Sequence, residues 1–326
     1  MSKIKKIGVL TSGGDAPGMN AAIRAVVRSC VYYKIEVVGI IQGFNGLIHN
    51  EIQPFDKRSV SNIINKGGTI LKTARSEEFK TVEGRKKAYE NIQKNGIEAL
   101  VIIGGDGSFT GASIFEEEFN IPCIGIPGTI DNDIYGTDYT IGFDTAVNTV
   151  VEAADKIRDT ASSHNRFFFI EVMGRDSGYI AMYSGIACGA EKVLIPELDG
   201  EFESLVETLK QSHASKKTSN IVIVAEGDQE GGAYEIAEKT KKVFPEYDVK
   251  VTVLGHIQRG GAPSYFDRVI ATRMGVKAVE VLLLGRSNIM VGIENNHIVT
   301  TSLKDAIKQH PSLNPELLNV AQIASI

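Results

Sequence analysis

The sequence predicts an α/β fold with mostly parallel sheets, and three observations support this prediction. Short apolar runs rich in isoleucine and valine recur along the chain, and most are nearly continuous, as in strands buried on both faces. Longer amphipathic segments separate these runs, and glycines gather in the short loops that follow them. The repeated order of strand, glycine-rich turn and helix is typical of α/β proteins. A length of 326 residues corresponds to about two domains.

The expected elements follow one another in a regular order. Strands are expected at Ile7–Leu10, Val37–Ile41, Ala99–Ile103, Ile124–Ile126, Phe167–Val172, Ile221–Ala225 and Val251–Leu254. Helices are expected at Pro17–Tyr32, before Phe119, at Thr145–Thr160 and at Arg268–Leu284. The polar stretch Asp199–Ser219 predicts a surface helix with a flexible end, and the tail after His310 predicts a short capping segment.

Composition excludes several classes of protein. Hydrophobic residues make up 43% and charged residues 23%, which excludes a disordered chain. The net charge is −5 and no basic stripe is visible, so nucleic acid is not an expected partner. No apolar run approaches the roughly 18 residues of a membrane span. Cys30, Cys123 and Cys188 form no CxxC pair and are expected to be packed, reduced thiols of a cytoplasmic protein.

A glycine-rich loop follows the first expected strand. Gly13, Gly14 and Gly18 lie between this strand and a helix, and Pro17 suits the first turn of that helix. The N–H groups and the dipole at a helix start attract phosphate. A phosphate site and a plain connecting turn both explain this loop.

A second loop of this kind carries a carboxylate. The run Ala99–Ile103 leads into Gly104-Gly105-Asp106-Gly107-Ser108, at the carboxyl end of a strand, where ligands bind in open α/β sheets. Asp106 therefore suits a magnesium ion on the phosphates of a nucleotide. A helix N-cap is the alternative role for Asp106, but two such loops in one chain favour phosphate binding.

A third segment, Pro127-Gly-Thr-Ile-Asp-Asn-Asp133, follows another expected strand. Phosphoryl transfer to an alcohol needs a carboxylate near the hydroxyl and neutralisation of charge around the phosphoryl group. Asp131 suits the base, and Thr129 suits a group that orients the acceptor. An Asx-rich turn explains the same spacing equally well.

These three segments, with Met173-Gly-Arg-Asp-Ser-Gly178 and Gly255-His-Ile-Gln-Arg-Gly-Gly261, resemble those of the bacterial ATP-dependent 6-phosphofructokinases. The resemblance implies two Rossmann-like α/β/α domains with central, mostly parallel sheets, in a homotetramer. It implies an ATP-binding domain of residues 1–142 and about 258–308, and a sugar-phosphate-binding domain of about 143–257 and 309–326. The implied reaction is phosphorylation of fructose 6-phosphate by ATP at the 1-hydroxyl.

The resemblance also implies roles around the nucleotide. Asp106 would hold the cofactor Mg²⁺, and Asp131 would deprotonate the sugar hydroxyl beside Thr129. Arg75 and Arg175 would neutralise charge on the transferred group. The residues expected to contact ATP are Gly14, Phe44, Arg75, Ser76, Gly105, Asp106, Gly107 and Ser108.

The residues of the expected sugar-phosphate site are spread between positions 129 and 259. Its residues are Thr129, Ile130, Asp131, Arg166, Met173, Gly174, Arg175, Glu226, Lys250, His256, Ile257, Gln258 and Arg259. Arg166, Lys250, His256 and Arg259 would hold the 6-phosphate, because a dianion needs several converging donors. In the family the first two of these cations come from a neighbouring subunit, so one chain alone is expected to be inactive. A surface position for each arginine and a core position for His256 are the alternatives.

Four positions at which this sequence can be compared with its relatives concern the choice of phosphoryl donor and the affinity for the substrates. Glycines stand at 107 and 128, where pyrophosphate-using relatives carry Asp and Lys, and this predicts room for ATP. Lys250 stands where relatives usually carry Arg and cannot form a planar bidentate clamp, which predicts a raised KM for the sugar phosphate. Phe44 replaces a Tyr beside the adenine and keeps the stacking ring.

A site for an anionic effector is the last implication of the resemblance. Arg24 and Arg28 share one helix face, although a solvated pair explains them as well. The family binds ADP or phosphoenolpyruvate there, between subunits, and the other matching residues are Arg158, Gly189, Glu191 and Lys217. Asn62 replaces a frequent Asp, and Ser215-Lys-Lys-Thr218 replaces Gly-Lys-Lys-His. These two changes predict weakened allostery.

Three alternative functions follow from parts of the same pattern. A pyrophosphate-dependent phosphofructokinase is disfavoured by Gly107 and Gly128. A lipid or NAD kinase shares the Gly-Gly-Asp-Gly loop but lacks the segments Pro127–Asp133 and Gly255–Gly261. A catalytically inactive, nucleotide-sensing subunit is disfavoured because Asp106, Asp131 and Arg175 are intact.

Overall fold

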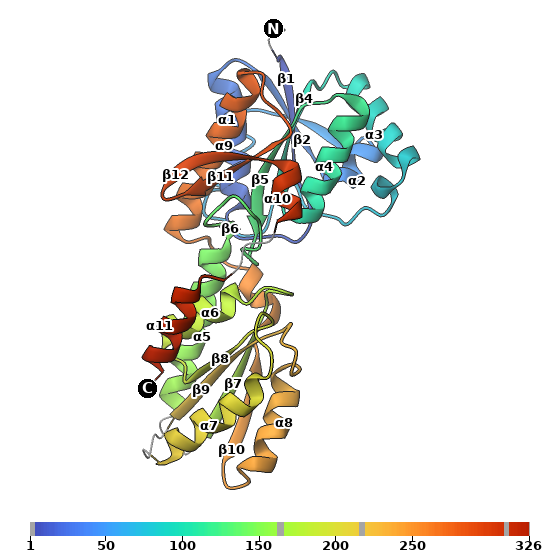
Figure 1. Ribbon diagram of the computed structural model, residues 1–326. Helices are drawn as coiled ribbons and strands as arrows, with labels where there is room; N and C mark the ends of the chain where they lie inside the picture. Colours follow the sequence, from blue (N-terminus) through green and yellow to red (C-terminus); the bar gives the residue numbers. More distant parts are fainter. Residues whose placement is uncertain (1–3, 162–165, 215–218, 310–312, 326) are drawn as a thin grey trace. The chain divides into compact units, whose positions relative to one another are not determined.

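The computed structural model describes residues 4–161, 166–214, 219–309 and 313–325. The chain forms two compact units, each with its own sheet and its own apolar core (Figure 1). The first unit comprises Met1–Thr129, Ile134–Asp144 and Arg259–Pro311, and the second comprises Ile130–Asp133, Thr145–Gln258 and Ser312–Ile326. The structural bounds thus assign Ile130–Asp133 to the second unit. Which substrate each unit binds stays a prediction.

The first unit is built on an eight-stranded sheet in the order β12-β11-β5-β4-β1-β2-β3, with β6 paired to β5. Its strands are β1 (Lys6–Thr11), β2 (Glu36–Ile40), β3 (Ile52–Phe55), β4 (Ala99–Gly104), β5 (Cys123–Thr129), β6 (Ile141–Gly142), β11 (Ile289–Glu294) and β12 (His297–Ser302). The pairings of β3 with β2 and of β12 with β11 are antiparallel, and all others are parallel. The prediction of a mostly parallel sheet is confirmed.

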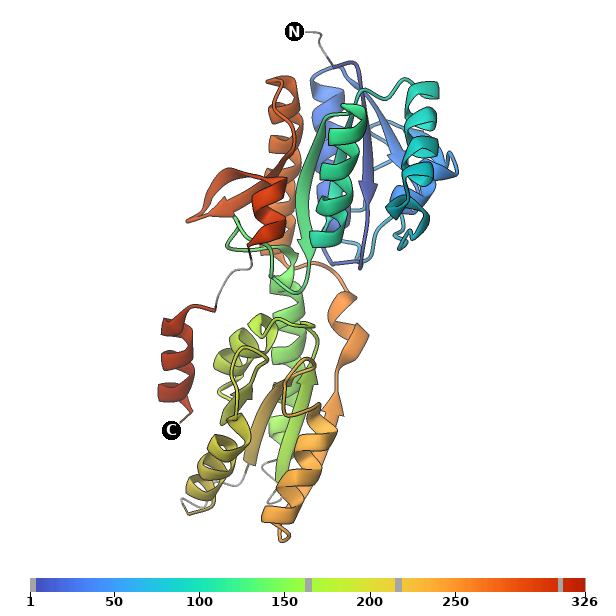
Figure 2. The same cartoon turned by 45° about the vertical axis from the view of Figure 1, so that its right-hand side comes forward.

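Helices cover both faces of this sheet (Figures 1 and 2). They are α1 (Met19–Tyr32), α2 (Gly43–Ile48), the 3₁₀ helix η1 (Glu78–Lys80), α3 (Val82–Lys94), α4 (Asp106–Phe119), α9 (Tyr265–Leu283) and α10 (Leu303–Lys308). Helices α1 and α9 pack against one another on one face, where a Cβ at Gly275 would lie 2.7 Å from the Cβ of Ala25. Such close packing of the two backbones requires glycine at 275.

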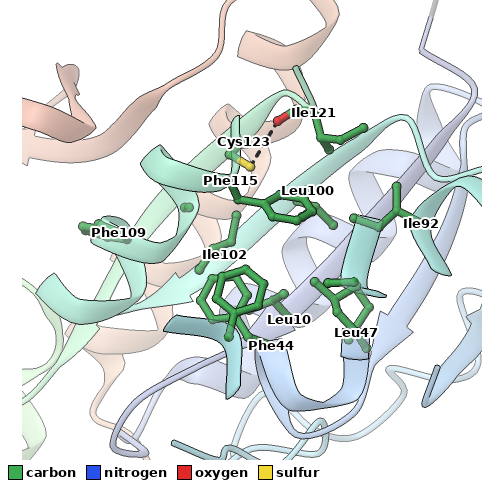
Figure 3. Packing of buried hydrophobic residues seen from close by; sticks show 14 of the residues in the cluster. Leu10, Phe44, Leu47, Ile92, Leu100, Ile102, Phe109, Phe115, Ile121 and Cys123 are labelled. Atoms are coloured by element: carbon green, nitrogen blue, oxygen red, sulfur yellow. Dashed lines mark hydrogen bonds between the residues drawn. The ribbon is translucent and has the colours of Figure 1, made fainter. Parts of the chain in front are cut away.

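One apolar core of the first unit lies between the sheet and α2, α3, α4 and α10 (Figure 3). Leu100 and Ile102 point from β4 toward this side, because alternate residues of a strand share a face. Phe109 and Phe115 of α4 are fully buried against them. The intervening Val101 and Ile103 are also fully buried, so both faces of the strand are covered, as its continuous apolar run predicts.

The second unit has a four-stranded, wholly parallel sheet in the order β10-β7-β9-β8. Its strands are β7 (Arg166–Val172), β8 (Lys192–Leu194), β9 (Ser219–Ala225) and β10 (Asp248–Val253). Its helices are α6 (Tyr179–Cys188), α7 (Glu201–Ala214), α8 (Ala233–Val243) and α11 (Pro315–Ala324), together with most of α5 (Phe143–Ala161). Phe167, Phe169, Val222 and Val224 form its core with α7 and α8.

Several local predictions can be compared with these elements. All expected strands and helices exist, with ends that shift by a few residues. The prediction that Pro17 lies in the first turn of a helix is wrong: α1 starts at Met19, and its N-cap is Gly18 with a left-handed φ of 109°. The three cysteines are free and buried, as predicted. In the described part of the chain, no helix combines the length and the apolarity that a bilayer span requires.

Candidate active site

The glycine loops after β1 and β4 lie against each other in the first unit. The backbone N–H of Ser12 donates to the carbonyl oxygen of Ile103 at 3.0 Å, which continues the parallel pairing past the end of β1. A Cβ at Gly104 would lie 2.5 Å from the carbonyl oxygen of Ser12 and 2.6 Å from Oγ of Ser108. Only glycine permits this approach, so the two loops form one surface at the carboxyl edge of the sheet.

Asp106 is the first residue of α4, and Gly105 is the N-cap. The alternative role of Asp106 as the N-cap is therefore wrong. A carboxylate in the first turn of a helix is stabilised by the helix dipole, and this one is only partly buried. Next to it, a Cβ at Gly107 would have no atom within 4 Å. The loop thus presents one acidic side chain beside open space.

Strand β5 runs parallel to β4 and ends at Thr129, two residues before Asp131. Thr129 is buried, and its Cβ lies 3.8 Å from the point where a Cβ at Gly105 would be. The carbonyl oxygen of Thr129 accepts a hydrogen bond from Oγ1 of Thr140 at 2.6 Å. Asp131 is only 4% exposed, and Oγ of Ser177 donates to its carbonyl oxygen at 2.8 Å. The backbone on both sides of Ile130 is therefore fixed by buried hydroxyl groups.

The other residues expected around ATP differ in exposure. Phe44 is only 5% exposed, belongs to the core and stacks on Phe79 at a centroid distance of 4.1 Å (Figure 3). Oγ of Ser76 donates to Oδ1 of Asn45, and Arg75 is exposed. One face of the Phe44 ring is thus covered by protein, and its contact with adenine stays a prediction.

In the second unit, the loop after β7 is locked to the loop after β9. Oε1 of Glu226 accepts from the backbone N–H groups of Gly174 at 3.3 Å and Arg175 at 2.9 Å. Arg175 has a left-handed φ of 53°, which is uncommon outside glycine and asparagine. A Cβ at Gly227 would lie 1.9 Å from the carbonyl oxygen of Arg175. The structure thus brings together Met173, Gly174, Arg175 and Glu226, as the sequence predicts.

The segment Gly255–Arg259 forms the short 3₁₀ helix η2. Gln258 is fully buried, and its Oε1 accepts from the backbone N–H of Met173 at 3.3 Å. His256 and Ile257 are exposed, so the alternative of a core histidine is wrong. Arg259 is counted with the first unit, where its Nη1 donates to the carbonyl oxygen of Asp15 at 3.0 Å.

Two of the expected 6-phosphate ligands lie at the opposite edge of the second sheet. Arg166 is the first residue of β7, whereas Met173 directly follows the last. Nε of Arg166 contacts Oδ2 of Asp248 at 2.9 Å, and Nζ of Lys250 contacts Oδ1 at 2.7 Å. Both hydrogen bonds lower the pKa of Asp248, and the one from Lys250 has the larger effect. The seven-residue strand β7 places Arg166 about 20 Å from the Met173 loop, and Lys250, which pairs with Phe168, lies two residues nearer to it.

The expected effector residues fall into two groups. In the first unit, burial lowers the pKa of Arg24, and the positive charge of Arg28 lowers it further. In the second, Nη2 of Arg158 donates to the carbonyl oxygens of Cys188 and Gly189, and Nη1 lies 4.0 Å from Glu191. Lys217 and the segment 215–218 lie outside the described residues.

Sequence reasoning missed the polar side chains that hold the loops of the candidate site. Ser177 and Thr140 fix the backbone next to Asp131 and Thr129, and Asn20 donates to the carbonyl oxygens of Lys66 and Gly67. Ser177 lies inside the segment Met173–Gly178, which the sequence singles out, so its importance for the site could have been predicted. No sequence pattern indicates which backbone oxygen a hydroxyl reaches.

The family model described as Phosphofructokinase matches residues 6–282. The chain is 55% identical over 326 residues to the protein named ATP-dependent 6-phosphofructokinase 2 from Bacteroides thetaiotaomicron, with 100% of both chains covered. It is 56% identical over 319 residues to the ATP-dependent 6-phosphofructokinase of Cytophaga hutchinsonii, with 98% of this chain and 97% of that one covered. These similarities span both units.

Solved structures show the same fold. The phosphofructokinase from Saccharomyces cerevisiae matches with a TM-score of 0.88 and 37% identity, covering 99% of this chain and 48% of that longer chain. A pyrophosphate-dependent phosphofructokinase from Marinobacter aquaeolei matches with a TM-score of 0.84 and 23% identity, covering 98% and 91% of the two chains. The second similarity concerns the fold alone.

Proposed function

The chain belongs to the phosphofructokinase family, and from this we propose that it transfers the γ-phosphoryl group of ATP to the 1-hydroxyl of fructose 6-phosphate. The products are fructose 1,6-bisphosphate and ADP, and the step belongs to glycolysis. The observation that carries this proposal is identity above 50% along the whole chain to relatives named for this reaction. The paired glycine loops with Asp106 support a nucleotide as donor.

ATP is favoured over pyrophosphate by the space at Gly107. Among the described residues, nothing lies within 4 Å of a Cβ at this position, so the start of α4 leaves room for a nucleotide. At Gly128 the geometry differs from the expectation, because a Cβ there would lie 3.1 Å from Met19 and from Ile103. Gly128 therefore serves packing inside the unit. An assay with each donor in turn tests the proposal, since turnover with pyrophosphate alone would contradict it.

The residues present fit a magnesium ion that arrives on the nucleotide. The described residues include no group of three or more histidines, cysteines and acids that could enclose a metal. Mg²⁺ is usually held by one or two carboxylates together with substrate phosphates and water, and Asp106 supplies one carboxylate at a helix start. When bound, the ion would neutralise negative charge on the phosphates. We assign Asp106 to hold it.

Asp131 is the proposed general base. It would take the proton of the sugar 1-hydroxyl as that oxygen attacks the γ-phosphorus, with Thr129 orienting the acceptor. Its backbone is fixed by Ser177, which suits a group whose carboxylate must stay in one place. Arg75 and Arg175 would neutralise the charge on the transferred group. Each such donor contributes roughly 3–4 kcal/mol to transition-state stabilisation.

The sugar-phosphate site is proposed to be completed by a second copy of the chain. One chain would supply the residues that contact the sugar and one ligand of its 6-phosphate: Met173, Gly174, Glu226, Ile257 and His256. Arg166 lies about 20 Å from the Met173 loop along β7, and Lys250, which pairs with Phe168, lies roughly 17 Å from it. Their distance supports the expectation that they act in a neighbouring subunit of a homotetramer.

Replacement of the proposed base is the most direct test of the mechanism. Asp131→Ser should lower kcat by about 10²- to 10⁴-fold, because no group then accepts the hydroxyl proton. Binding of the nucleotide should change little, as measured by titration calorimetry. Asp199→Ser, at an exposed acid in the loop before α7, is the matched control and should keep wild-type turnover. Unaltered turnover of Asp131→Ser would refute the assigned role.

Charge at position 107 should decide whether the donor binds. Gly107→Asp should fold normally, because a side chain there starts in open space, but should raise the KM for ATP by at least about tenfold through repulsion of the phosphates. Gly107→Ala adds the same Cβ without the charge and should remain close to wild type. Equal KM values for the Asp and Ala variants would show that charge at this position does not matter.

The lysine at 250 should limit affinity for the sugar phosphate. Lys250→Arg should lower the KM for fructose 6-phosphate about threefold or more, because a guanidinium binds phosphate in a bidentate manner. The KM for ATP should stay the same, and Lys241→Arg, on the exposed end of α8, should change neither value. An unchanged or higher KM for the sugar phosphate would contradict this interpretation.

We also propose that an anionic effector site survives in weakened form. Arg158 is already engaged by the carbonyl oxygens of Cys188 and Gly189, and Asn62 lacks the charge of the usual Asp. Initial rates against fructose 6-phosphate should therefore follow a nearly hyperbolic curve that ADP hardly shifts. A steep sigmoidal curve that ADP relieves would contradict weakened allostery.

A further inference from the structure

Arg259 makes an unexpected contact with the glycine loop after β1. Its Nη1 donates to the carbonyl oxygen of Asp15 at 3.0 Å. A Cβ at Gly14 would lie 2.6 Å from Nη1 and 3.1 Å from Cζ, so the guanidinium rests directly on the backbone of Gly14. Gly14 has no left-handed φ. An added Cβ at Gly14 would therefore displace the guanidinium, whereas the backbone conformation of Gly14 does not itself demand glycine.

The backbone that carries Arg259 is itself braced within the first unit. A Cβ at Gly67 would lie 2.2 Å from the carbonyl oxygen of Gly261, so the two chain segments touch through their backbones. Asn20 of α1 donates to the carbonyl oxygens of Lys66 and Gly67, and its Oδ1 accepts from the N–H of Ile70. The contacts of Gly67 with Gly261, and of Asn20 with the backbone of residues 66–70, thus limit movement of the chain next to Arg259.

We infer that Arg259 is a positioning residue of the phosphate-binding loop Gly13–Asp15, in addition to its expected contact with the sugar 6-phosphate. This inference rests on the proposed function, because it takes the loop to receive the phosphates of the donor. The guanidinium partly neutralises the negative charge of the Asp15 carbonyl oxygen and places a positive charge beside the backbone of Gly14. Both effects favour a polyphosphate at this loop.

One guanidinium can perform both roles. Arginine has five N–H donors in a planar fork, and the bond to Asp15 uses one of them. The remaining donors can face a phosphate without release of the loop. A lysine at 259 would place one point charge there and could not hold two partners in the same fixed geometry. The structure therefore assigns to Arg259 an influence on nucleotide affinity even in the absence of sugar.

Binding of a non-hydrolysable ATP analogue, Mg-AMPPNP, without any sugar phosphate tests this inference. Titration calorimetry should show about tenfold weaker binding for Arg259→Gln, and an intermediate loss for Arg259→Lys. His256→Gln alters the other expected 6-phosphate ligand of η2 and is the matched control. It should raise the KM for fructose 6-phosphate and leave the affinity for the analogue unchanged.

A double-mutant cycle with Gly14→Ala separates positioning from a general loss of charge. The added Cβ displaces the guanidinium, so Gly14→Ala alone should weaken binding of the analogue. The double variant should lose less than the sum of the two single losses, because both changes break one contact. Additive losses would overturn the inference, as would wild-type affinity of Arg259→Gln. Should Arg259→Gln fail to fold, the same cycle is measured with Arg259→Lys.

Failure of this inference can be distinguished from failure of the proposed function. The binding measurement contains no sugar, so it does not depend on the identity of the acceptor. A wild-type chain that binds Mg-AMPPNP but does not phosphorylate fructose 6-phosphate would contradict the proposed function and leave the role of Arg259 to be judged by the cycle.

Discussion

The contact between the loops after β1 and β4 is the constraint on which the proposed nucleotide site depends. Strands β1, β4 and β5 are parallel neighbours, so their carboxyl ends meet at one edge of the sheet. The hydrogen bond from Ser12 to Ile103 extends this pairing into the loops, and the bare backbone of Gly104 lets them close. From this edge the chain carries Asp106 into α4 and leads through Thr129 to Asp131. Any side chain at 104 would separate the two loops and displace Asp106 at the start of α4.

The polarity of the second sheet imposes a different constraint. Its four strands are all parallel, so the loops that follow them, with Met173 and Glu226, share one edge, and the first residues of the strands share the other. Arg166 and Asp248 are paired residues at the starts of β7 and β10, which places Arg166 and Lys250 around one carboxylate. The parallel sheet thus places two of the proposed 6-phosphate ligands away from the loops that carry Met173 and Glu226, which supports the proposal that a second copy of the chain completes the site.

Much of this architecture can be predicted from the sequence because the buried strands are marked by continuous apolar runs. The antiparallel edge strands β3 and β12 were missed, since Ile52–Phe55 and His297–Ser302 are partly exposed and carry polar residues. The parallel strands β8 (Lys192–Leu194) and β11 (Ile289–Glu294) were missed as well, although they are largely buried. The identity of the N-cap of α4 was also missed, because Gly105 and Asp106 are both plausible there and only the backbone decides between them. Phe44 illustrates another limit: its ring was expected beside a ligand, and its stacking on Phe79 follows from α2 packing into the core, which no local pattern reveals.

The glycines of these loops show why a short motif carries more than one constraint. Gly104 is required because another backbone approaches it. At Gly14 an added Cβ would displace the guanidinium of Arg259, and at Gly107 an added Cβ would have nothing from the rest of the described residues within 4 Å. The chain's own packing therefore constrains the first two positions and leaves the third open. Glycine lets a ligand approach the backbone closely, so the open space at Gly107 supports the proposal of a bulky donor such as ATP.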